Sequence, residues 1–235
     1  MPEPIQQGSA NNNPPPPAAD DRAFNPNRIF YIVPHNLWST ETKVLDLTGS
    51  LPDTIAYTGG VISNELRDVA RDAGKDKFLA NSPIYIIKRP HWWSTKSTVY
   101  SASKDKPSKE LAYWKQPCTS TGKAHITFPD SSTDGTHELT VSPPSLISRT
   151  NAWVQDSVQY EWDCDSWLLA NRMTLHKKLG GKRLVVARYA QRWGSWVTGG
   201  VLLVQEGEIN ALVTVLTAVV MLRKMQQRAG ERKGA

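Results

Sequence analysis

The feature that most constrains the fold of this chain is an apolar segment close to its C-terminus. Residues Ala211 to Leu222 include no charged residue, and threonines alone interrupt the hydrophobic run. A helix that is apolar on every side must be buried in a large protein core or in lipid. A bilayer span needs about 20 apolar residues, and runs of about 10–14 more often form buried helices. We therefore expect Glu208 to Leu222 to form a helix inside a protein core.

Composition favours an intracellular globular protein. The 235 residues are 39% hydrophobic and include nine tryptophans, enough for a substantial core. The N-terminus has no apolar run typical of a signal peptide, so we expect a protein that is cytoplasmic or peripheral at a membrane and is not secreted. Cys118 and Cys164 do not make a disulfide framework, and we expect both to be reduced. A net charge of +6 can attract anionic lipid headgroups or nucleic acid, but an excess of this size is also typical of ordinary surface solvation. We expect no nucleic-acid partner.

Three regions follow one another along the chain. Residues 1–27 are rich in proline and asparagine, and we expect them to form a disordered tail. We expect the four consecutive prolines in this tail, Pro14 to Pro17, to be extended and solvated, and the alternative is a peptide to which a protein partner binds. Residues 28–228 are expected to form one mainly β domain, and residues 229–235 a short basic tail.

The middle region has the pattern of an all-β protein, because short apolar or alternating runs are separated by turn residues. In the clearest run, Val158, Tyr160 and Trp162 alternate with polar neighbours, as in a strand with one wet face. Ten to twelve strands are expected. The runs are 28–33, 43–47, 84–88, 98–102, 111–115, 123–128, 138–141, 158–163, 167–176, 184–192 and 199–204.

One segment in this region has helical spacing instead. Apolar residues recur from Ile62 to Ala73, with Ser63 or Asn64 as a candidate N-cap and Gly74 as a candidate C-cap. We expect a short amphipathic helix on the outside of the strands.

The strands and the apolar C-terminal helix together predict one architecture. A helix packed outside a sheet needs a wet side, and this helix has none. We therefore predict a closed antiparallel barrel of about twelve strands around a buried hydrophobic C-terminal α-helix. Closure also removes exposed strand edges.

This order of elements resembles the tubby C-terminal-like superfamily, which includes tubby proteins, phospholipid scramblases and LURP-one-related proteins. The resemblance covers about Arg28 to Arg228. It rests on the strand count, on Glu206 to Asn210 before the helix, on the apolar helix itself and on the basic stop Arg223-Lys224. It implies a roughly twelve-stranded barrel around a hydrophobic helix.

Within that superfamily the chain looks most like divergent tubby-like proteins of fungi. Their late segments have a cadence similar to Val158 to Trp162 and Leu184 to Tyr189. The scramblase branch carries cysteine-rich segments that this chain lacks, so we do not expect scrambling activity.

The tubby branch binds phosphoinositides through basic residues on a strand and hairpin in the first half of the domain. The nearest counterpart here runs from Lys88 to Lys96 and includes Trp92 and Trp93. Cations pair with lipid phosphates, and tryptophan prefers the membrane interface. We expect binding of anionic phospholipid headgroups here. The alternative is a solvated hairpin whose tryptophans cap the barrel core. The candidate site residues are Lys88, Arg89, His91 and Lys96.

Other polar clusters have simpler explanations. The basic residues around Gly180-Gly181 indicate a charged surface hairpin, and Asp163-Cys164-Asp165 indicates a turn after a strand. Glu206 and Glu208 are expected to complement the dipole at the start of the helix. The five histidines show no metal-ligand spacing. We expect no cofactor, no metal and no catalytic site. The basic residues of the hairpin are Lys177, Lys178, Lys182 and Arg183.

Three functional classes remain open from the sequence. The first is a non-catalytic domain that binds anionic lipid or a protein partner. The second is a carbohydrate-binding β module, for which tryptophans would supply stacking platforms. The third is a tail-anchored membrane protein that uses its C-terminal helix as the anchor.

Overall fold

The computed structural model describes most of the chain in three helices and twelve strands. The described residues are 24–36, 38–51, 61–102, 108–117, 119, 121–129, 137–145, 148, 150–164, 172–191 and 198–231. The helices are α1 (Asn64–Ala73), α2 (Lys77–Ala80) and α3 (Ala211–Glu231). The strands are β1 (Arg28–His35), β2 (Glu41–Asp46), β3 (Tyr85–Lys88), β4 (Lys96–Ser101), β5 (Glu110–Lys115), β6 (Ala124–Thr127), β7 (Glu138–Val141), β8 (Asn151–Gln155), β9 (Val158–Cys164), β10 (Arg172–Leu179), β11 (Lys182–Gln191) and β12 (Thr198–Val204).

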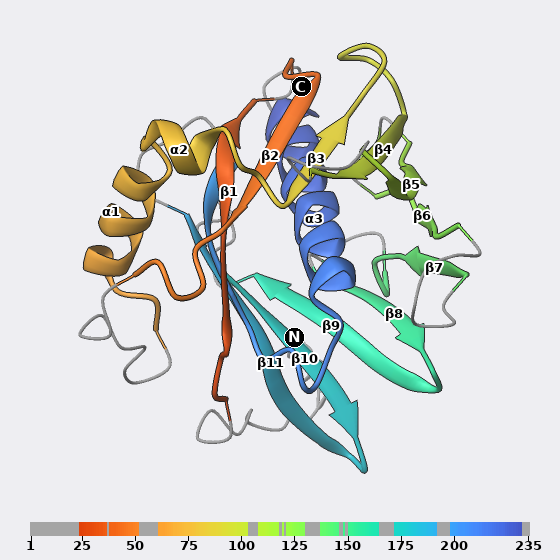
Figure 1. The fold of residues 1–235 in the computed structure, drawn as a ribbon. Coiled ribbons are helices and arrows are strands. Elements are labelled where there is room, and N and C mark those ends of the chain that lie inside the picture. The colour runs from red at the N-terminus through yellow and green to blue at the C-terminus, as the bar shows by residue number, and fades with distance from the viewer. Residues whose placement is uncertain are drawn as a thin grey trace, which may run out of the picture.

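All twelve strands belong to one antiparallel sheet, in the order β7-β6-β5-β4-β3-β2-β1-β12-β11-β10-β9-β8. The two ends of this row meet where Ser142, just after β7, pairs with Ala152 of β8. Two backbone hydrogen bonds of 3.0 and 2.8 Å join these residues. The predicted antiparallel barrel of about twelve strands is therefore confirmed (Figure 1).

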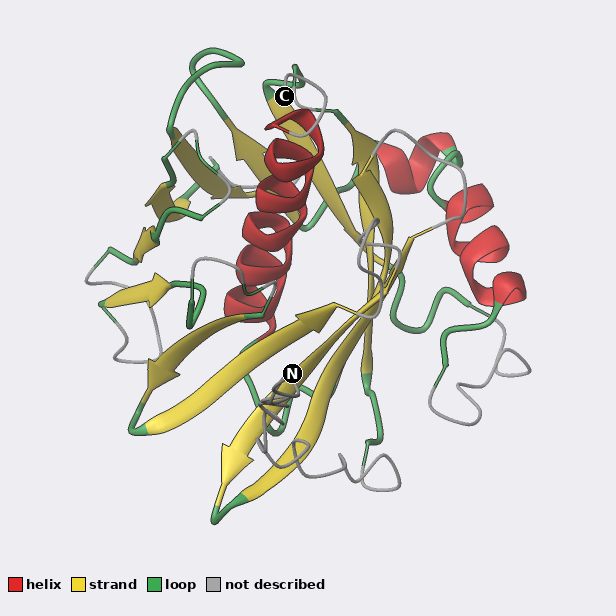
Figure 2. Cartoon of the chain, turned by 180° about the vertical axis from the view of Figure 1, so that it is seen from behind, coloured by secondary structure: helices red, strands yellow, loops and turns green. Residues whose placement is uncertain are grey.

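Helix α3 lies inside the barrel, with strands around it (Figure 2). Val215, Leu216 and Val220 are fully buried against the inward-facing residues of the strands. The threonines are satisfied locally, since Thr214 Oγ1 donates to Asn210 O over 2.9 Å. Thr217 Oγ1 accepts the indole N–H of Trp162 of β9 over 3.0 Å. The apolar segment therefore forms the barrel core, as its all-round hydrophobicity predicts.

The bounds of this helix differ from the prediction at both ends. It starts at Ala211 and continues to Glu231, well beyond Leu222. Asn210 is its cap, because the Asn210 Oδ1 atom accepts the N–H of Val213 over 3.2 Å. The predicted basic stop is wrong: Arg223 and Lys224 lie inside the helix and are buried. Their long side chains find neutral oxygens on the barrel wall, so the helix does not end where charge begins.

A second apolar layer covers part of the barrel's outer face. The predicted amphipathic helix is confirmed as α1, with Ser63 Oγ accepting the N–H of Leu66 over 3.0 Å. Leu66 and Ala70 pack on outward-facing residues of β1, β2 and β12, such as Tyr31. Gly74 ends the helix, and a side chain there would collide with the ring of Tyr31.

The sequence pattern missed one strand and placed one boundary too late. Strand β8 was not predicted, and it joins β9 through a turn in which Asp156 and Ser157 both have positive φ. Turns of this kind usually contain asparagine or glycine, and neither occurs here, so the residues of this turn did not predict a hairpin. The folded part also begins before Arg28, because Phe24 is buried.

Candidate functional site

The predicted site residues surround the connection between β3 and β4, at the end of the barrel where α3 terminates. Lys88 ends β3 and Lys96 begins β4, whereas Arg89 and His91 lie between the strands. This connection lies against the β1–β2 connection, because the backbone N–H of Arg89 donates to Thr40 O over 2.8 Å. We call this end of the barrel the rim.

Three tryptophans contact one another on the rim and remain exposed. The ring centroids of Trp38 and Trp92 are 4.3 Å apart, and those of Trp92 and Trp93 are 5.3 Å apart. The His91 imidazole stacks on Trp93 at 4.8 Å. The exposed fractions are 64% for Trp38, 45% for Trp92 and 59% for Trp93. The alternative prediction that Trp92 and Trp93 cap the barrel core is therefore wrong. We call these four residues the rim aromatic cluster.

Trp38 was not among the predicted site residues. It comes from the β1–β2 connection, 54 positions before Trp92, and only the strand pairing of β2 with β3 brings them together. Trp114, Trp153 and Trp162 are buried in the barrel core. Trp167, Trp193 and Trp196 lie outside the described residues, as does Cys118.

Two lysines flank the rim aromatic cluster on the outer surface. The Lys96 Nζ atom lies 4.8 Å from the ring centroid of Tyr113, and Lys96 is beside Lys115 in the register of β4 and β5. The Lys88 Nζ atom lies 4.0 Å from Glu41 Oε2, which neutralises it in part. Lys88, His91, Lys96 and Lys115 are all exposed.

Arg89 differs from the other three predicted site residues. Its guanidinium turns into the rim, where it donates to Trp92 O over 2.8 Å and to Ser39 O. Burial lowers the pKa of Arg89. Arg89 therefore holds together the two connections that carry the tryptophans, while the lysines and His91 face solvent.

Beneath the rim, the last turns of α3 direct a ring of polar side chains to the barrel wall. Arg223 donates to Ser97 Oγ of β4, and its guanidinium lies 4.7 Å from the Trp114 ring centroid. Lys224 Nζ donates to Asn151 Oδ1 over 2.6 Å and to Val141 O over 3.4 Å, and so bridges β7 and β8. Further along the helix, Gln226, Gln227 and Arg228 donate to His35 O, Pro117 O and Ser148 O.

Burial depresses the basicity of this ring. It lowers the pKa of Arg223 to about 9, with Arg89 adding a repulsive charge. It lowers the pKa of Lys224 to about 8, with Arg228 contributing. Burial also lowers the pKa of His35 to about 4. Within the described part of the chain, neither Arg223 nor Lys224 forms an ion pair with a carboxylate. No sequence signal identified these residues, because a cation after an apolar run looks like a helix stop.

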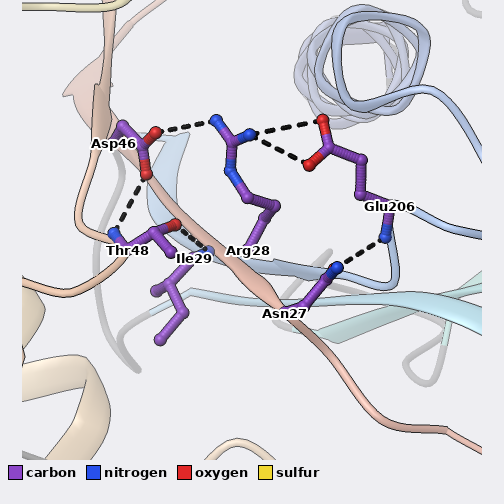
Figure 3. Close-up of polar contacts among 6 residues, drawn as sticks. All are labelled: Asn27, Arg28, Ile29, Asp46, Thr48 and Glu206. Carbon is purple, nitrogen blue, oxygen red and sulfur yellow. Dashed lines mark hydrogen bonds and ion pairs between the residues drawn. The ribbon is translucent and has the colours of Figure 1, made fainter.

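At the opposite end of the barrel, cations and carboxylates are paired. Arg28 bonds to Asp46 over 2.8 Å and to Glu206 over 2.9 Å (Figure 3). Burial alone lowers the pKa of Arg28, but the two carboxylates outweigh it and the pKa is raised. Glu208 pairs with Lys177 over 2.9 Å. Glu206 and Glu208 were predicted to complement the dipole of α3, but both precede its first turn and form ion pairs with Arg28 of β1 and Lys177 of β10.

The remaining candidate clusters are also engaged in internal contacts. Lys178 pairs with Glu161, and Arg183 pairs with Asp163. Gly180 and Gly181 adopt positive φ in the β10–β11 turn, as predicted for a surface hairpin. Cys164 lies 3.9 Å from the sulfur of Met225, and Asp165 is outside the described residues. Over the described ranges, no group of His, Cys, Asp and Glu has a geometry that could hold a metal ion.

Comparison with known proteins identifies no family for this chain. No family model, no curated protein and no solved structure matches this chain. None of the helices in the described residues combines the length and hydropathy that crossing a membrane requires.

Proposed function

We propose that this protein is a non-catalytic, tubby-like domain that binds anionic membrane surfaces through the rim aromatic cluster and its flanking lysines. The observation that carries the proposal is the contact of Trp92 with both Trp38 and Trp93, since all three rings are exposed. Exposed aromatic clusters of this kind usually mark interaction sites. Tryptophan is enriched at the membrane–water interface, where its ring is apolar and its N–H is wet.

The charges around the cluster fit an anionic surface. Each lysine or arginine near an anionic leaflet contributes about 1 kcal/mol of binding free energy. Lys96 and Lys115 lie side by side on the same outer surface, and no carboxylate contacts either of them in the described residues. The resemblance to tubby-like proteins, of which one branch binds phosphoinositides, supports the same proposal.

Co-sedimentation with vesicles tests this function. Vesicles of phosphatidylcholine alone are compared with vesicles that also contain phosphatidylserine and a phosphoinositide. We expect the wild-type protein to prefer the anionic vesicles. The double variant W92A/W93A should bind them at least about tenfold more weakly, since it removes most of the apolar contact.

The control variants change exposed apolar residues away from the rim. Val154 and Leu179 lie at the tips of other hairpins and are 63% and 54% exposed. V154A and L179A should bind vesicles as the wild type does. Equal loss in the controls, or binding no better than to phosphatidylcholine at physiological salt, contradicts the proposal.

Carbohydrate binding is the second candidate, because the exposed tryptophan rings also offer stacking platforms. The lysines distinguish the two functions. In a lipid site, K96Q/K115Q weakens binding and reduces its salt dependence, whereas sugar stacking on Trp38, Trp92 and Trp93 does not need these charges. Binding to a glycan array that survives K96Q/K115Q favours the carbohydrate function. A protein partner for the proline-rich tail remains a prediction, since Pro14 to Pro17 lie outside the described residues.

A further inference from the structure

His91 is the member of the rim aromatic cluster that can carry a charge. Its imidazole stacks on the indole of Trp93, with ring centroids 4.8 Å apart and ring planes 13° apart. The N–H of Ser94 donates to His91 O over 3.0 Å, which closes a tight turn across the two tryptophans between them. His91 and Trp93 are both exposed. A titratable ring therefore lies at the proposed membrane-contact surface.

Cations flank His91 on several elements. Arg89 lies in the same connection, Lys88 ends β3, and Lys96 begins β4. Lys115 of β5 lies directly beside Lys96 in the register of the sheet. The surface around His91 is therefore positively charged before the imidazole takes up a proton, and a protonated His91 adds to that charge.

The β1–β2 connection packs against this one and brings a single carboxylate to the rim. It has no charged residue between His35, which is buried, and Glu41. The Oε2 atom of Glu41 lies 4.0 Å from the Nζ atom of Lys88. Arg223, on the helix beneath, is buried. In the described part of the chain, no carboxylate contacts His91. An anionic surface outside the protein is therefore the partner that can balance a proton on this ring.

We propose that protonation of His91 strengthens the binding of the rim to anionic membranes, so that the protein binds them more tightly at mildly acidic pH. This inference rests on the proposed membrane function. Histidine is the side chain whose charge normally changes between about pH 5 and 8. An imidazolium is attracted by the face of the tryptophan ring on which it stacks and by anionic headgroups. Because the anionic surface favours the protonated ring, binding takes up a proton, and by linkage the affinity rises as the pH falls.

Co-sedimentation with vesicles of phosphatidylcholine and phosphatidylserine tests this regulation. The full chain is compared at about pH 5.5 and about pH 7.5, on either side of the usual histidine transition, at one ionic strength. One added cation at an anionic leaflet should make the wild type bind about fivefold more tightly at the lower pH. H91Q should bind equally at both, with the affinity that the wild type has at the higher pH, because glutamine stays neutral.

The matched control is H125Q, which removes another exposed histidine. The Nδ1 atom of His125 lies 3.9 Å from Glu138 Oε1, so a carboxylate of the protein can balance its charge. H125Q should therefore keep the wild-type rise in affinity. Vesicles of phosphatidylcholine alone should show no rise for any of the three proteins, because they carry no net negative charge.

The outcomes separate this inference from the proposed function. If the wild type does not prefer anionic vesicles at either pH, the membrane function fails and the regulation fails with it. If the wild type prefers them equally at both pH values, the regulation alone is overturned. It is also overturned if H91Q keeps the rise in affinity, or if H125Q loses as much of it as H91Q does.

Discussion

The cations at the two ends of the barrel have different partners, carboxylates at one end and neutral oxygens at the other. Where α3 begins, Arg28 contacts two carboxylates and Lys177 contacts Glu208. Where α3 ends, Arg223 and Lys224 donate to neutral oxygens of Ser97, Asn151 and Val141. At the first end, carboxylates of the protein itself neutralise these cations. The second keeps its positive charge, and it is the end that carries the exposed tryptophans.

This difference has an energetic side. A buried cation without a counter-charge loses hydration that neutral oxygens restore only in part. At the other end, Arg28 is partly exposed and is paired with two carboxylates. The rim therefore sacrifices some stability and retains a field that attracts anions, which supports the proposal that the ligand-binding face lies there.

The largest effect on stability is expected from a substitution in the middle of α3, because this helix runs between the two ends of the barrel. Leu216, in the middle of α3, is fully buried. L216A leaves a cavity in the barrel core and should lower the free energy of unfolding by about 2–5 kcal/mol. Urea denaturation measures this change. A loss below about 1 kcal/mol would indicate that α3 is not the packed centre of the barrel, and the comparison of its two ends would then lose its basis.

Two smaller changes in stability should separate the two ends directly. R28A removes contacts with Asp46 and Glu206 and should lower the free energy of unfolding by about 1–2 kcal/mol. R223M removes a buried cation that pairs with no carboxylate among the described residues, and should leave stability unchanged or raise it by up to about 1 kcal/mol. Both values come from the same urea titrations. If R223M costs as much as R28A, the charge at the rim is as well compensated as the charge at the other end.

Much of the architecture could be predicted from the sequence, because it depends on local patterns. The apolar run from Ala211 to Leu222 predicted the buried helix, and the alternation in segments such as Val158 to Trp162 predicted the strands. Ser63 and Gly74 bounded α1 as expected. Each of these features depends on residues that are close together in the sequence. Hydrophobic periodicity and helix capping detect such local patterns.

The functional features could not be predicted because they join distant residues. Lys224 was interpreted as part of a helix stop, and its partner Asn151 is 73 positions away. The residues around Trp38 do not indicate a site, and only the pairing of β2 with β3 places Trp38 against Trp92. Arg67 of α1 likewise donates to Gln191 O of β11, which lies 124 positions later in the chain.

The subtlest expected difference between the ends is in the dependence of stability on pH. Burial holds the pKa of Lys224 near 8, against 10.5 in the unfolded chain. Below pH 8 both states are protonated, so the full cost of the buried charge is present. Between pH 8 and 10.5 the unfolded state binds more protons than the folded state, and the free energy of unfolding therefore rises with pH.

Urea titrations of the wild type and K224M from pH 7 to pH 10 measure this rise. We expect it to be on the order of 1 kcal/mol in the wild type and to be reduced in K224M. K96M, which removes an exposed lysine of the same rim, should keep the wild-type profile, since solvent already screens that charge. Identical profiles for K224M and the wild type would mean that Lys224 titrates alike in both states. The rim would then carry no uncompensated charge at the β7–β8 junction, and its positive field would come from the surface lysines alone.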